Sequence, residues 1–243
     1  MPGDAAERAA YEAALARNDA FLRDVVERLE SCPFARGCRE EGGLWRAVSW
    51  ADPAQAPARM LALAEALQAQ ARARRPEVAL MVLPGLSSLS AAAFDALHLG
   101  LREAYEALPT PRFYVVAFHP DYPVDARSPS TLVRFWRRSP DPTLQFVARE
   151  VLAPLRRSAD EADRVRRAAE LIEAGAGVEE LERALRPPRD LSARVAEQNA
   201  RRFAEDSEAI RAAVDALCER GRRERELHGS DPSWPDYGWE TVR

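Results

Sequence analysis

The chain has 243 residues, of which 47% are hydrophobic and 30% charged, with a formal net charge of -4. This acidic balance argues against a general nucleic-acid binder, which normally carries a basic excess. The chain has no run of about 18 apolar residues to span a membrane, and its acidic start lacks the apolar core of a signal peptide. We therefore expect a cytoplasmic protein that binds neither nucleic acid nor membrane.

Every basic residue is an arginine, because the chain contains no lysine. The absence of lysine excludes Schiff-base catalysis, a pyridoxal-phosphate anchor and a Walker-type phosphate lysine. Codon preference in a GC-rich genome is the simplest cause, and the exclusions hold whatever the cause. Three cysteines are too few for a disulfide framework in a chain of this length.

The first predicted element is an amphipathic helix over residues 5–31. It should end before Pro33, because proline disfavours helical geometry in the residue that precedes it. A short strand at 44–50 and a second helix at 52–75 are expected next. The apolar positions of the first helix, which recur at helical spacing, are Tyr11, Leu15, Leu22, Val25, Val26 and Leu29.

Strands and helices alternate in the middle of the chain. Continuous apolar runs predict buried strands at 77–85 and 112–120. A helix is expected at 90–108, and another at 141–155 with Asp141 as its cap. This alternation predicts an α/β fold, with α+β as the alternative: a small mixed sheet of three or four strands, partly parallel and flanked by helices.

The C-terminal part has a different character. Residues 158–228 are predicted to be almost entirely helical and to extend a core domain at 1–157, while 229–243 form a short tail. Two tryptophans in that tail indicate docking on the fold. An apolar stripe on the last long helix, at 191–228, usually packs on the sheet layer or on a partner chain, so a homodimer through this helix is one expectation.

A candidate site follows the strand at 112–120. In open α/β sheets, ligands gather outside the carboxyl ends of the strands, where His119 is expected. Arg138 and Ser139 follow in a proline-rich connection, and arginine presents donors that match carboxylate or phosphate. The predicted helix beginning at Asp141 would add free backbone N–H groups to an anion site. An ordinary solvated loop is the competing interpretation.

Cys32 is the second candidate for chemistry. A thiolate at this position could be a nucleophile or a soft metal or haem ligand. Placement at the end of the first helix would raise the pKa of this thiol, and a buried, inert cysteine is the competing interpretation. The spacing between Cys32 and Cys38 matches no standard metal loop, so no metal ligand is assigned.

Several short motifs combine reactive residues with prolines in a fixed order. They are Cys-Pro-Phe-Ala at Cys32–Ala35, Phe-His-Pro-x-Tyr at Phe118–Tyr122, and Arg-Ser-Pro-x-Pro at Arg138–Pro142 with the Arg149-Glu150 pair, followed by Asn199. Together they resemble a bacterial family of uncharacterised proteins, the domain of unknown function 1415. The resemblance implies no established activity, but it singles out the same stretch of the chain.

The resemblance adds Tyr122, Arg149 and Glu150 to the candidate substrate-binding residues. It also shows a departure, because Gln145 stands where the family usually carries a histidine, in the helix predicted before Arg149. If the family used two histidines, this chain would have altered that chemistry. An ion pair with a core carboxylate is the structural alternative for Arg149.

Three functions remain open from the sequence. The first is an enzyme acting on a small carboxylate or phosphate, with His119 as acid or base, Cys32 as a candidate nucleophile and Arg138 as the anion clamp. The second is a metal or haem site that uses Cys32 or His119 with Asp121 or Glu150. The third is a non-catalytic module that pairs through its last helix. No cofactor is assigned.

Overall fold

The computed structural model describes residues 5–32, 34–150, 166, 168–173, 177, 180–181 and 191–242, the last segment by its backbone alone as far as 194. The expected boundary between 157 and 158 lies outside the described residues. So does Pro33, at which the first helix was expected to stop.

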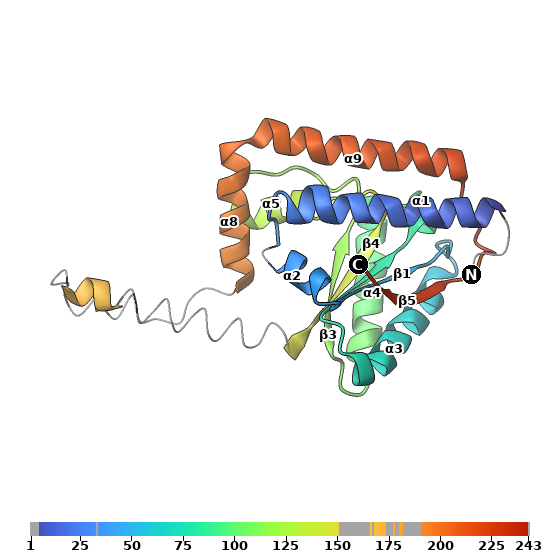
Figure 1. The fold of residues 1–243 in the computed structure, drawn as a ribbon, viewed down its shortest axis with the longest axis horizontal. Coiled ribbons are helices and arrows are strands. Elements are labelled where there is room, and N and C mark those ends of the chain that lie inside the picture. Colours follow the sequence, from blue (N-terminus) through green and yellow to red (C-terminus); the bar gives the residue numbers. More distant parts are fainter. Residues whose placement is uncertain are drawn as a thin grey trace.

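One mixed sheet organises the described part of the chain (Figure 1). Its five strands stand in the order β3-β4-β2-β1-β5, with β1 and β2 parallel and the other neighbours antiparallel. The strands are β1 (Leu44–Val48), β2 (Val78–Val82), β3 (Phe113–Phe118), β4 (Thr143–Ala148) and β5 (Tyr237–Thr241). The expected mixed α/β fold with partial parallel pairing is confirmed. The expected number of three or four strands is wrong.

β4 lies where the sequence predicted a helix. Leu144 and Phe146 are fully buried against the core, whereas Gln145 and the other odd-numbered positions face the opposite side of the sheet. Pairing with β2 on one edge and β3 on the other stabilises the strand. The Asp-Pro pair that suggested a helix cap therefore precedes a strand, and no helix N-terminus for an anion exists at Asp141.

β5 is the second strand that the sequence did not indicate. It pairs antiparallel with β1, and the Trp239 indole N–H donates a 2.8 Å hydrogen bond to the carbonyl of Leu63. Trp234 packs edge-on against Trp50, with ring centroids 5.0 Å apart. The tail thus docks through its tryptophans, as expected, but as an edge strand of the sheet.

Two long helices cover one face of the sheet: α3 (Ala56–Arg74) and α4 (Ala91–Glu106). They lie on the side away from α1 and α9 in Figure 1. The largest hydrophobic cluster fills the layer between these helices and the strands. Phe94, Phe113 and Phe146 are among its fully buried members. This layer is therefore the main hydrophobic core of the described part of the chain.

Shorter helices and two long ones cover the opposite face. The first helix continues into a π-helical segment, and the predicted helix at 191–228 is two helices, separated at Asp206, which caps the second through its side chain. In Figure 1, α1 and α9 lie side by side, and α8 crosses near one end of them. The elements are α1 (Ala5–Phe21), η1 (Leu22–Glu27), α2 (Ala35–Glu40), α5 (Pro129–Trp136), α8 (Leu191–Glu205) and α9 (Ser207–His228), with a short 3-10 turn, η2 (Pro84–Leu86), after β2.

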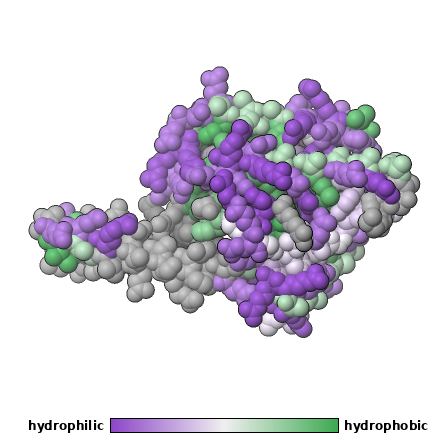
Figure 2. Space-filling view, viewed as in Figure 1, coloured by the Kyte–Doolittle hydropathy of each residue, from purple (hydrophilic) through white to green (hydrophobic). Residues whose placement is uncertain are grey.

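The apolar stripe on α9 packs on the chain itself. Val214 and Leu217 join Phe21 of α1 and Phe135 of α5 in a second hydrophobic cluster. A homodimer through this helix stays a prediction. Apolar residues on the face seen in Figure 2 form small areas among hydrophilic ones. No helix in the described part is both long and apolar enough to cross a membrane.

Candidate functional site

A cavity of about 310 Å³ lies on the sheet face opposite α3 and α4. Its floor is the sheet itself, since alternate residues of the central strands point into it. Its walls come from the end of α1, from η1, α2, α5 and α8. The floor residues are Leu44, Val78, Leu80, Val116, Phe118, Thr143, Gln145 and Val147, and the apolar wall residues include Leu22, Val26, Phe34, Val133, Trp136 and Val195.

Arg137 is the one basic residue that lines this cavity among the described residues. It follows α5, and its carbonyl accepts a 3.0 Å hydrogen bond from the backbone N–H of His119, which holds it beside the end of β3. The side chain is half-buried, and this burial lowers the pKa of the guanidinium. The Asp95 carboxylate lies near enough to act on this pKa in the opposite direction. Within the described part of the chain, however, no carboxylate forms an ion pair with Arg137 and no group accepts a hydrogen bond from its side chain.

Gln145 lies in the middle of the cavity floor. On β4 it stands opposite Leu80 of β2 and Val116 of β3, which also line the cavity. No described group forms a hydrogen bond with its side-chain amide. Its amide can therefore both donate and accept a hydrogen bond to a molecule in the cavity.

A third polar group beside the cavity lacks a partner. The indole Nε1 of Trp136 is buried and has no hydrogen-bond acceptor among the described residues. An N–H group in this state is uncommon, because leaving a buried donor unpaired costs about 1–3 kcal/mol. The indole N–H is itself enclosed by protein, so the donors that a ligand can reach at this wall are those of Arg137, and they favour a ligand that brings acceptor oxygens.

Cys32 also lines the cavity, next to the start of α2. Burial raises the pKa of its thiol, although hydrogen bonds from the backbone N–H groups of Phe34 and Ala35 act in the opposite direction. The expected direction of the shift is thus correct, but its cause is burial and not the end of the first helix. A raised pKa disfavours the thiolate, so this cysteine is a poor nucleophile near neutral pH.

α8 holds the segment that carries Cys32. The side-chain amide of Asn199 donates a 3.1 Å hydrogen bond to the carbonyl of Ser31, and Arg202 donates to the carbonyl of Leu29 at 2.7 Å. Asn199, which the family resemblance singled out, therefore lines the cavity and also fixes the position of the segment that carries Cys32.

The π-helical segment η1 forms another part of the wall, through Leu22 and Val26. The hydrogen bond from Ser31 N–H to the carbonyl of Val26, at 3.1 Å, continues its five-residue spacing. Such widened turns are rare and are found frequently at functional sites. Here the segment places two apolar side chains over the floor of the cavity.

His119 lies outside this cavity and is fully buried. Its Nε2 is 3.1 Å from the carbonyl oxygen of Leu89, and its Nδ1 accepts a 3.2 Å hydrogen bond from the N–H of Asp121. These contacts fit a neutral ring that donates through Nε2, and burial lowers the pKa accordingly. Because both nitrogens contact backbone groups, the ring joins the end of β3 to the loop before α4 and offers no nitrogen to a substrate.

The Arg-Ser-Pro motif lies beneath α9. The guanidinium of Arg138, predicted to clamp an anion, donates to the carbonyl of Pro120 at 2.9 Å and pairs with Asp215. The hydroxyl of Ser139, also predicted to bind substrate, donates to the carbonyl of Asp141. Neither residue lines the cavity, so the predicted meeting of Cys32, His119 and Arg138 in one cavity is not what the structure shows.

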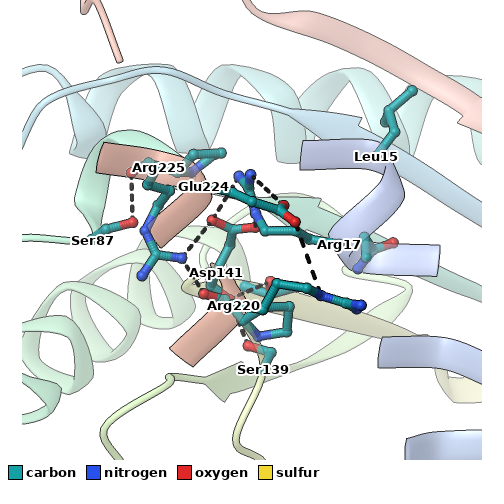
Figure 3. Close-up of polar contacts among 12 residues, drawn as sticks. Leu15, Arg17, Ser87, Ser139, Asp141, Arg220, Glu224 and Arg225 are labelled. Atoms are coloured by element: carbon teal, nitrogen blue, oxygen red, sulfur yellow. Dashed lines mark hydrogen bonds and ion pairs between the residues drawn. The ribbon is translucent and has the colours of Figure 1, made fainter. Parts of the chain in front are cut away.

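Asp141 forms a buried ion cluster in place of a helix cap (Figure 3). Arg17 of α1 donates to both carboxylate oxygens, from Nε at 2.8 Å and from Nη2 at 3.1 Å. Arg225 of α9 donates to Oδ1 at 3.0 Å, and Glu224 lies 3.5 Å from Arg17. This cluster joins α1, α9 and the start of β4. Its charged groups pair with one another, not with a ligand.

The remaining predicted substrate-binding residues have internal partners. Tyr122 is buried and donates to Asp95, and burial raises the pKa of its hydroxyl. Arg149 pairs with a glutamate of α4 and lies over the Tyr114 ring, 4.8 Å from its centroid. Glu150 forms a 2.7 Å ion pair with Arg112. None of the three predicted residues lines the cavity.

The metal alternative finds no set of ligands in the described part of the chain. Among the described residues, no three or more histidine, cysteine, aspartate or glutamate side chains are grouped closely enough to hold a metal ion. Asp121, one of the expected ligands, points toward Arg222 at 3.5 Å. The thiols of Cys32 and Cys38 are both free.

Arg137 belongs to the run of arginines after His119 but was not among the predicted site residues, because residues 120–140 were interpreted as a proline-stiffened loop. A usable signal was present: Ser128 and Thr131 form a reciprocal capping box, with Pro129 in the first turn. A helix beginning there would place positions 133, 136 and 137 on one face, by the spacing of three and four residues. All three positions line the cavity.

Comparison with protein families finds one matching family model, described as "Protein of unknown function (DUF1415)", over residues 13–183. This range contains every strand of the cavity floor and the helices η1, α2 and α5 of its wall. Neither the curated proteins nor the solved structures include a match to the chain.

Proposed function

The chain belongs to the DUF1415 family, and we propose that it binds a small, mostly apolar carboxylate in the cavity between the sheet and the helices η1, α2, α5 and α8. The observation that carries this proposal is the unpaired guanidinium of Arg137 in a cavity whose walls are otherwise mainly apolar. Small-molecule sites typically combine such walls with a few placed polar groups.

A single carboxylate fits the polar groups better than a phosphate does. Arginine matches the two oxygens of a carboxylate with a fork of parallel donors. A phosphate dianion would keep a net negative charge after pairing with Arg137 alone, and an uncompensated charge in an apolar site is strongly unfavourable. Gln145 can donate a further hydrogen bond, and apolar contact with the floor would hold the rest of the molecule.

The proposal moves the anion site by one residue from the sequence-based expectation, from Arg138 to Arg137. It keeps Cys32 beside the ligand, as a wall residue whose raised pKa favours the neutral thiol. It keeps neither His119 nor Ser139 as a ligand contact, because both side chains bind backbone groups. Binding is therefore the proposed role, and an enzymatic step at Cys32 remains the alternative.

Isothermal titration of the full chain with hexanoate, hexylamine and inorganic phosphate tests the proposal. We expect hexanoate to bind and the other two to bind at least about tenfold more weakly. Arg137→Gln should weaken hexanoate binding by about tenfold or more, because it removes a hydrogen bond between charged groups. Arg222→Gln, at an exposed site on α9, is the matched control and should leave binding unchanged.

Two outcomes would overturn the proposal. One is an absence of hexanoate binding by a folded protein. The other is hexanoate binding that Arg137→Gln leaves at the wild-type affinity, since the guanidinium would then not be the group that holds the carboxylate.

A further inference from the structure

The cavity has a second charged wall residue, Glu77, at the start of β2. The strand register separates it from Arg137. Val78, the neighbour of Glu77, pairs with Val147 at one end of the floor, whereas Phe118, beside the Arg137 segment, pairs with Thr143 at the other. The two opposite charges therefore border opposite ends of the same cavity.

The distance along the floor keeps these charges apart. Positions 143 and 147 are four residues apart on β4, which corresponds to about 13 Å at roughly 3.3 Å per residue. In the described part of the chain, neither Arg137 nor Glu77 forms an ion pair. The middle of the floor between them holds Leu80 and Val116, with Gln145 as its polar group.

Among the described residues, Glu77 has a hydrogen-bond donor but no ion-pair partner. The Cys38 thiol hydrogen-bonds to its carboxylate, and burial, together with this carboxylate, raises the pKa of the thiol to about 12. The thiol therefore stays protonated and offers one weak donor. A half-buried carboxylate with so little compensation favours a ligand that brings a positively charged donor.

We propose that the ligand is a dipolar amino-carboxylate, whose carboxylate binds Arg137 and whose ammonium group binds Glu77, with an apolar spacer over the middle of the floor. This inference rests on the proposed function, because it places the carboxylate at the same guanidinium. Each charge of the ligand then meets one opposite charge of the protein. The cavity with its ligand is neutral, which lowers the electrostatic cost of closing apolar walls around it.

The experiment compares 6-aminohexanoate with hexanoate by titration calorimetry of the full chain, with 4-aminobutanoate and 8-aminooctanoate as length variants. We expect 6-aminohexanoate to bind about tenfold more tightly than hexanoate, because it adds one charged hydrogen bond. Glu77→Gln should abolish that preference. Glu65→Gln, on an exposed position of α3, is the control and should keep the preference.

The outcomes separate this inference from the proposed function. If hexanoate binds through Arg137 but no amino-carboxylate of any length binds more tightly, the dipolar ligand is refuted and the carboxylate site stands. If an amino-carboxylate binds more tightly but Glu77→Gln keeps the preference, Glu77 is not its partner and the inference fails. If neither compound binds the folded protein, both proposals fail. The comparison of ligands on the wild-type chain tests the preference for a dipolar ligand even if Glu77→Gln does not fold.

Discussion

The buried ion cluster at Asp141 allows a quantitative test of what holds the helical layer on the sheet. Asp141→Ala would remove a carboxylate that is 1% exposed and that accepts three charged hydrogen bonds from Arg17 and Arg225. Arg17, itself 3% exposed, would keep Glu224, at 3.5 Å, as its one remaining ion-pair partner among the described residues. The substitution therefore leaves a buried cation without adequate compensation.

Removing one partner of a buried ion pair typically lowers the free energy of unfolding by about 3–5 kcal/mol. That loss is a large part of the roughly 5–15 kcal/mol that stabilises a typical protein. For a chain of this length, each kcal/mol shifts the melting temperature by about 2–4 °C. We therefore expect Asp141→Ala to lower the melting temperature by roughly 6–20 °C.

Urea denaturation followed by circular dichroism measures the loss directly. The control is Asp121→Ala, which removes an exposed carboxylate 3.5 Å from Arg222, and it should lower the free energy of unfolding by at most about 1 kcal/mol. If Asp141→Ala were no more destabilising than this control, the cluster would not stabilise the fold, and the reasoning from burial would be refuted.

Two further predictions concern His119 and Gly85. Burial lowers the pKa of His119, so below about pH 6.5 the unfolded chain binds more protons than the folded chain. The free energy of unfolding should fall as the pH falls from 7 toward 5, by up to about 1.4 kcal/mol per pH unit from this residue, and a flat profile in urea titrations would contradict this. A Cβ on Gly85 would lie 2.5 Å from the carbonyl oxygens of Trp50 and Ala51, so Gly85→Ala should destabilise by about 1–3 kcal/mol in the same assay. Gly100→Ala, on α4 with open space around it, should instead stabilise by up to about 1 kcal/mol, and equal effects of the two changes would exclude close packing as the cause.

Much of the fold follows from local pattern. The apolar runs that became β2 and β3 are continuous because both strands are buried, and such runs are visible in any sequence. The same holds for α3 and α4, whose lengths and caps are local properties. The sequence did not predict β4, because Asp141 and Pro142 are typical of a helix start. The extended backbone is selected by pairing with two distant strands, and this pairing is visible in the sequence only as a weak alternation of apolar and polar residues. The sequence did not predict β5, because the strand that it pairs with, β1, lies nearly two hundred residues earlier in the chain.

The candidate site also divides into features that local sequence predicts and features that distant contacts decide. Residue types alone indicated Arg138 near the end of β3 and Cys32 before α2. Cys32 does border the cavity, whereas the arginine that borders it is the adjacent Arg137. Tertiary structure decided which of the two adjacent arginines lacks an ion-pair partner among the described residues, because Arg138 meets Asp215 of α9 whereas Arg137 lines the cavity. The side chains of neighbouring residues point in different directions. Whether a charged side chain forms an ion pair within the protein depends on partners that lie far away in the chain. Sequence thus determined the chemical groups available, and only the packing of α8, α9 and β4 determined which of them a ligand could reach.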